Sequence, residues 1–226
     1  MVFIAFGIIL IAAALPAFIW LIFFLCEDAH PEPRKLLIAV FFSGAFISIP
    51  VLSAQVLFEG VLGTLGGDII SSMIGLALIE EIFKFFAAFT IVRRHPAFDE
   101  PVDAMIYMIV AALGFATVEN FFITVNSLSA PGIGLTGTLA TLILRFVGAT
   151  LLHTLSSGLV GYHWARGMMR GSLRCSLMWG IVLATAAHTV FNYLILRFQD
   201  INLLYPSLFL VAAAFFILND FEKLKT

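Results

Sequence analysis

The chain opens with MVFIAFGIILIAAALPAFIWLIFFL (1–25), a stretch without a single charged side chain. Its length matches the roughly 20 apolar residues that a helix needs to cross the hydrocarbon core of a bilayer. The run is far longer than the roughly 7–15-residue apolar region of a secretory signal, and no basic segment precedes it. We therefore expect a retained membrane-spanning helix over 2–25.

The rest of the chain repeats this apolar character. Hydrophobic residues make up 62% of the 226 positions and charged residues 12%, about half the usual share of a soluble domain. A chain this apolar needs lipid as its solvent, and in lipid the backbone groups are satisfied within helices. We predict an all-α polytopic transmembrane bundle of about seven spans, formed by a single domain over 1–226. The spans are predicted at 2–25, 36–57, 69–92, 102–125, 138–165, 175–198 and 204–219.

Basic residues predict the orientation, because Lys and Arg concentrate in cytoplasmic loops. Nine of them fall on one side of the seven-span arrangement and only Arg197 on the other. This bias places the N-terminus outside and the C-terminus in the cytoplasm of a multi-pass protein, and we expect a prokaryotic cell membrane. The nine are Arg34, Lys35, Arg93, Arg94, Arg166, Arg170, Arg174, Lys223 and Lys225. The net charge of −2 gives no indication of a nucleic-acid partner.

Ionisable side chains interrupt the apolar runs and carry the functional information. Each costs roughly 2.5–3.5 kcal/mol near the bilayer centre on insertion scales, so such groups tend to face the bundle interior. At a rise of about 1.5 Å per residue, polar groups of four spans fall at one level, at or just outside the midplane. These residues are Glu80 and Glu81 in the third span, Glu119 in the outer half of the fourth, His153 in the fifth, and His188 in the sixth, where Asn192 shares the helix face of His188.

Helical spacing relates these residues to one another. Glu80 and Lys84 are four residues apart and share a helix face, so Lys84 can neutralise a carboxylate. Glu81 points about 100° away from Glu80, so we expect one of the two to face the centre and the other to support it. Arg145, near the outer end of its span, is expected to extend its guanidinium toward the membrane surface. Taken singly, each residue has a structural explanation; taken as a set at one depth, they favour a function.

Two histidines with a carboxylate form a ligand set that suits zinc and leaves a position open for water. A further glutamate then acts as general base and passes the proton to a leaving amine. The same residues also work without a metal: a Glu and a His deprotonate a water, while a second His and an Asn stabilise the oxyanion. Both arrangements hydrolyse an amide, and the sequence leaves both open. Neither a GxSxG nor an HExxH motif is present.

Four ordered elements resemble the PrsW-type intramembrane proteases of the CAAX-protease and bacteriocin-processing superfamily. EEIFK at 80–84 matches the EExxK signature of that family, and GFATVEN at 114–120 matches its FxxxEN element. HTLSSG at 153–158 and HTVFN at 188–192 resemble its two His-bearing elements. The resemblance covers roughly residues 70–195, within a motif-bearing core at about 69–198.

The resemblance implies an endopeptidase that cleaves membrane-anchored proteins, and founding members are associated with the first cut of an anti-sigma factor. Its implied partners are a single-span membrane protein as substrate and membrane lipid. Carried over by position, Glu80 is the water-activating carboxylate, and Asn192 orients His188 or stabilises the oxyanion. The other members of the implied centre are Glu81, Glu119, His153 and His188. If zinc is bound, the implied ligands are His153, His188 and Glu119.

Functions from other classes could use the same residues. The main alternative is a proton- or ion-coupled carrier, because intramembrane Glu, His and Lys also mark ion pathways; the inverted repeats typical of such carriers are not visible in the sequence. A haem protein with His153 and His188 as axial ligands would leave the buried carboxylates unexplained. A non-enzymatic scaffold would tolerate the loss of a motif residue, and none of the four elements has lost one.

Overall fold

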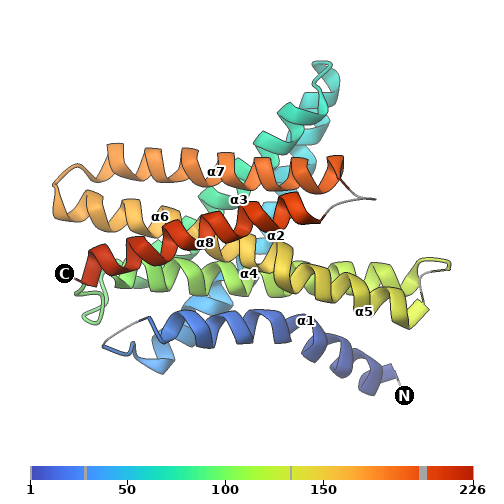
Figure 1. Cartoon of the computed structure of the whole chain (residues 1–226), viewed down its shortest axis with the longest axis horizontal. Coiled ribbons are helices and arrows are strands. Elements are labelled where there is room, and N and C mark those ends of the chain that lie inside the picture. The colour runs from blue at the N-terminus through green and yellow to red at the C-terminus, as the bar shows by residue number, and fades with distance from the viewer. Residues whose placement is uncertain (1, 28–29, 133, 199–202, 226) are drawn as a thin grey trace.

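The computed structural model describes residues 2–27, 30–132, 134–198 and 203–225, and every regular element in these ranges is a helix (Figure 1). In order these are α1 (Val2–Leu25), α2 (Arg34–Thr64), α3 (Ile69–Val92), α4 (Asp103–Ser129), α5 (Gly134–Arg145), η1 (Phe146–Thr150), α6 (Leu151–Met169), α7 (Leu173–Arg197) and α8 (Leu204–Lys225). The π-helical turn η1 joins α5 to α6 without a break. The described chain therefore forms seven continuous helical segments.

Six of these segments are long and apolar enough to cross a membrane. The exception is α3, in which Glu80, Glu81 and Lys84 interrupt the apolar sequence. The predicted polytopic helical membrane fold is confirmed. Figure 1 shows the two termini at opposite ends of the bundle, as an odd number of spans requires. Which end faces the cytoplasm stays a prediction.

The second span is longer than the sequence predicted. Residues 58–68 carry four glycines and were expected to form a loop, yet α2 continues to Thr64. Gly60 and Gly63 remain helical, and the first glycine with a positive φ is Gly66, at 70°. Glycine weakens a helix without ending it unless the chain also needs a left-handed conformation, so the turn begins only where φ changes sign.

Helix α4 lies at the centre of the bundle and packs against α1, α2 and α6 (Figure 1). Its first four turns, from Asp103 to Thr117, are buried on every side. The backbones of α2 and α4 approach so closely that a Cβ added at Gly114 would lie 1.9 Å from the carbonyl oxygen of Phe41. A Cβ at Gly44 would meet the carbonyl oxygen of Ala111 at the same distance. Small residues thus permit the close packing on which membrane bundles depend.

The α2–α3 hairpin crosses the other helices at a steep angle, and its tip projects from the bundle (Figure 1). Asp68 caps α3 by accepting a hydrogen bond from the backbone N–H of Ser71 at 2.9 Å. The hydroxyl of Ser71 also donates to this carboxylate, and both bonds lower the pKa of Asp68. Deeper in the bundle, Ser43 of α2 donates to the Ala87 carbonyl of α3 at 2.9 Å. This packing brings the middle of α3 against α6 and α7.

Candidate active site

Glu81 of α3 has the most complete set of hydrogen bonds in the site, and it is 0% exposed. Its Oε1 accepts from Lys84 Nζ at 2.9 Å and from Ser156 Oγ at 3.0 Å, and it lies 3.0 Å from His188 Nδ1. Its Oε2 accepts a longer bond of 3.4 Å from Ser157. The carboxylate therefore ties α3 to α6 and α7, and it has the partners that a buried charge requires.

Glu80, the preceding residue, accepts a hydrogen bond on one oxygen only. Its Oε1 accepts from Gln55 Nε2 of α2 at 3.0 Å. Its Oε2 is buried and has no hydrogen-bond partner within the described part of the chain. This oxygen lies 3.7 Å from His153 Nδ1 and 3.8 Å from His188 Nε2, beyond hydrogen-bond range. A buried acceptor without a partner needs an explanation, and an atom supplied by a ligand is one.

His153 and His188 meet beside this oxygen with ring centroids 5.1 Å apart and planes at 81°. A carboxylate holds the outer nitrogen of each ring: His153 Nε2 lies 2.8 Å from Glu119 Oε2, and His188 Nδ1 lies 3.0 Å from Glu81 Oε1. Such a contact fixes the tautomer and leaves the other nitrogen as an acceptor. His153 Nδ1 and His188 Nε2 therefore direct their lone pairs toward the same space as Glu80 Oε2.

Lys84 supplies a buried cation to this centre and is 0% exposed. Its Nζ donates to His153 Nδ1 at 2.8 Å and lies 3.4 Å from Glu80 Oε2, in addition to its bond with Glu81. The ammonium also lies 4.8 Å from the centroid of the Phe115 ring, on the ring face. Lys84 thus neutralises the two glutamates of its own helix, as the four-residue spacing predicted for Glu80.

Arg145 does not extend toward the membrane surface, so that prediction was wrong. Its guanidinium turns inward and donates from NH2 to Glu119 Oε2 at 2.6 Å and from Nε to Asn120 Oδ1 at 2.6 Å. Helix α5 begins at Gly134, so Arg145 lies about 16 Å along the helix. At that depth its guanidinium does not reach solvent easily. Arg145 therefore fixes the carboxylate that in turn holds His153.

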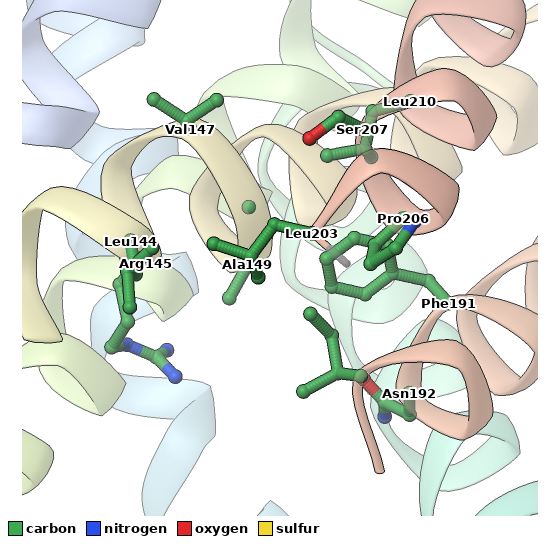
Figure 2. Close-up of a pocket in the computed structure, with 12 residues that line it drawn as sticks. Leu144, Arg145, Val147, Ala149, Phe191, Asn192, Leu203, Pro206, Ser207 and Leu210 are labelled. Carbon is green, nitrogen blue, oxygen red and sulfur yellow. The ribbon is translucent and has the colours of Figure 1, made fainter. Parts of the chain in front are cut away.

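Asn192 lies one helical turn beyond His188 and outside the centre. It lines a cavity bounded by α5–η1, α7 and α8, together with Arg145 (Figure 2). Its side chain makes no hydrogen bond with any other residue that the structure describes. Of the residues predicted for the site, the structure brings Glu80, Glu81, Glu119, His153 and His188 together, whereas Asn192 stands at their edge. The role predicted for Asn192 stays a prediction.

Three side chains offer a metal-binding geometry. One ligand atom each from Glu80, His153 and His188 lie within 4.8 Å of one another, and all three residues are buried. Two imidazoles and a carboxylate are a donor set that suits zinc, and Glu80 Oε2, which accepts no hydrogen bond from the described residues, fits the same purpose. The sequence predicted Glu119 as the carboxylate ligand, whereas the structure offers Glu80 in that place. Glu119 contacts His153 on the opposite side of the ring, and its ligation of a metal stays a prediction.

Sequence reasoning missed two groups that contact the glutamates. Gln55 is the one amide side chain in the second predicted span, where the other polar residues are serines, and that was a usable signal. Ser156 and Ser157 stand one turn after His153, where they reach Glu81. Serine is common in membrane helices as a packing residue, so its position alone did not indicate a contact with the site.

Together the fold and the site define a class: a polytopic helical membrane protein with a carboxylate–histidine centre buried between four of its helices. A family model described as "PrsW family intramembrane metalloprotease" matches residues 32–219. The chain belongs to this family, and it is a multi-pass intramembrane protease. The predicted enzyme class is confirmed, and the carrier alternative finds no support.

Bacterial proteins named "Protease PrsW" share similarity with most of the chain. The protein of Geobacillus kaustophilus (strain HTA426) is 26% identical over 206 residues, which cover 90% of this chain and 85% of the relative. That of Oceanobacillus iheyensis is 25% identical over 197 residues, covering 87% and 86%. The Bacillus subtilis (strain 168) protein is 32% identical over a shorter stretch of 98 residues, covering 43% and 44%. No solved structure matches the chain.

Proposed function

We propose that this protease hydrolyses a peptide bond of a single-span, membrane-anchored protein, with Glu80, His153 and His188 as its reaction centre. The observation that carries the proposal is the buried Oε2 of Glu80, which accepts no hydrogen bond from the described residues and lies 3.7 and 3.8 Å from a ring nitrogen of each histidine. A polar gap of this size suits a bridging water. Water held there would contact the carboxylate and the acceptor nitrogen of His188, whereas His153 Nδ1 already accepts from Lys84.

Glu80 would act as general base on this water. Its Oε1 is fixed by Gln55, so its Oε2 keeps a constant direction toward the histidines. The carboxylate takes one proton from the water, and the hydroxide adds to the scissile carbonyl carbon. The same proton then goes to the leaving amine as the C–N bond breaks. The proposal assigns Asn192 to the oxyanion as a neutral N–H donor.

The same three donors would hold zinc. When bound, zinc would supply a Lewis acid that polarises the scissile carbonyl and lowers the pKa of a bound water. In that arrangement Glu80 would serve as a ligand, while Glu81 and Glu119 would hold the imidazoles through their second nitrogens. Lys84 would have to release His153 Nδ1, to which it donates at 2.8 Å, and it could keep its bond to Glu81.

The substrate proposal rests on the family. The resemblance to founding members indicates an anti-sigma factor as one such substrate, cut at its first site. The test is proteolysis in liposomes with a panel of single-span membrane proteins, anti-sigma factors among them. Wild type should cleave at least one member, and Glu80→Gln should be inactive while remaining folded. Glu59→Gln, at an exposed glutamate of α2, is the matched control and should cleave like wild type. Equal cleavage by Glu80→Gln would overturn the assignment.

Metal content separates the two arrangements. We expect about one zinc per purified chain, loss of activity with a membrane-permeant chelator, and recovery when zinc is returned. His188→Ala should lower the zinc content measured by mass spectrometry, because it removes one of three ligands. Full activity in a chelated, metal-free sample would contradict the zinc arrangement. The metal-free arrangement, in which Lys84 keeps its hydrogen bond to His153, would then stand.

A further inference from the structure

A cavity of about 350 Å³ opens between α5–η1, α7 and α8 (Figure 2). Most of its lining is apolar, as a surface that meets membrane-spanning sequence should be: Leu144, Val147, Gly148, Phe191, Leu203 and Leu210. Arg145 of α5 and Asn192 of α7 are the polar exceptions, and Ser207 contributes a hydroxyl from α8. In Figure 2, Arg145 and Asn192 lie toward one side of the cavity, and Ser207 and Leu210 toward the other.

The cavity adjoins the reaction centre along two of its walls. On one wall, Arg145 donates to Glu119 at 2.6 Å, and Glu119 lies 2.8 Å from His153. On the other wall, Asn192 stands one turn of α7 beyond His188. Neither histidine lines the cavity, so a molecule in it would be separated from His153 by Arg145 and Glu119, and from His188 by one turn of α7.

Some N–H groups of Arg145 and Asn192 are not used in the hydrogen bonds that the structure shows, so they can bind a molecule in the cavity. A guanidinium has five N–H donors, and Arg145 uses two of its nitrogens, on Asn120 and Glu119. The Asn192 amide contributes two more N–H groups, unpaired within the described ranges. An extended peptide inside a bilayer has carbonyl groups that need such donors, because lipid supplies none.

The π-helical turn η1 forms part of the wall. Such turns are rare and occur often at functional sites. At Gly148 an added Cβ would meet only the ring of Phe191, at 3.4 Å, so the glycine leaves backbone open to the cavity. Trp20 of α1 fixes the turn from behind by donating to the Phe146 carbonyl at 3.0 Å.

We propose that this cavity binds an unwound, extended part of the substrate's membrane-spanning segment, with substrate carbonyls on Arg145 and Asn192. The proposal rests on the proteolytic function above and names where its substrate docks. The cavity is at the lower end of the roughly 300–1,000 Å³ of ligand sites. It is too small for a helical turn with its side chains, about 10–12 Å across, so it selects a few extended residues.

Photocrosslinking tests the proposal without requiring hydrolysis. A photoreactive phenylalanine analogue is placed at position 207, which lines the cavity, or at position 208, which is exposed and outside it. Both are made in the Glu80→Gln background and reconstituted in liposomes with the same panel of single-span proteins. We expect capture of a panel member from position 207 at least tenfold above capture from position 208. Equal capture from both positions, or only lipid adducts from position 207, would overturn the proposal.

Filling the cavity gives a second readout in the otherwise wild-type protein. Ser207→Trp and Gly148→Leu should each lower cleavage at least tenfold, mainly through KM, whereas Leu208→Trp should cleave like wild type. Wild-type rates in both cavity variants would contradict the proposal. The proposed hydrolysis and the proposed docking site fail differently. Capture of a single-span protein at position 207 without its cleavage by wild type would contradict the proposed hydrolysis. Cleavage without capture at position 207 would contradict the docking site.

Discussion

Two neighbouring glutamates on α3 have opposite surroundings. Glu81 contacts two serines, a lysine and a histidine, and both of its oxygens are bonded. Glu80 accepts a hydrogen bond on one oxygen. The other oxygen has no hydrogen bond within the described part of the chain, lies 3.4 Å from Lys84 Nζ, and faces two histidines. A buried charge with complete partners holds helices together, whereas a buried oxygen without a partner is available for chemistry. On the proposed assignment, one EE motif combines a carboxylate that holds the helices together with a carboxylate that reacts.

The largest effect on stability should come from removing the cation that the two glutamates share. Lys84→Met would leave Glu80 and Glu81 without the ammonium, and breaking a buried ion pair costs about 3–5 kcal/mol. We expect a large loss of unfolding free energy in detergent micelles. Lys223→Met is the control, because Lys223 is half exposed, at 51%, and pairs with Asp220, so it should cost less than about 1 kcal/mol. Similar losses in both variants would show that the Lys84 network contributes little.

A smaller effect, on kcat and zinc content, is expected when the side chain that positions Glu119 beside His153 is removed. Arg145→Met would free Glu119, which positions the His153 ring. Partners of this kind typically contribute about 10–100-fold in activity or metal affinity. The measurement is kcat in liposomes beside the zinc content of the purified variant, with Arg197→Met at an exposed helix end as control. Unchanged kcat and zinc content would mean that Glu119 holds His153 without help.

The smallest effect on stability should follow from removing one of the hydrogen bonds that Glu81 accepts, the bond from Ser156. Ser156→Ala removes a single donor, while Lys84 and His188 remain on the same oxygen. A net loss of about 1 kcal/mol in unfolding free energy is expected, with cleavage within a few-fold of wild type. A loss of activity far beyond the loss of stability would move Ser156, and with it Glu81, into the reacting part of the site.

Much of this arrangement could be predicted from the sequence, because hydropathy fixes the depth of a residue in a membrane helix. That is why Glu80, His153 and His188 were expected at one level, and the structure places them in contact range. The direction in which a side chain points around its helix axis was harder to predict. The π turn η1 holds one residue more per turn than an α-helix and lies between Arg145 and His153, so spacing alone could not place the guanidinium. Helix ends were also uncertain: α5 begins four residues before the predicted span, at Gly134.

The most direct measurement compares Glu80→Gln with Glu81→Gln for both cleavage and unfolding free energy. We expect Glu80→Gln to lose at least about 100-fold in cleavage, within the range of general-base catalysis, with stability close to wild type. We expect Glu81→Gln to lose stability first, because Lys84 and His188 lose their charged partner. The reverse pattern, an inactive but stable Glu81→Gln and an active Glu80→Gln, would contradict the assignment of Glu80 as the reactive carboxylate.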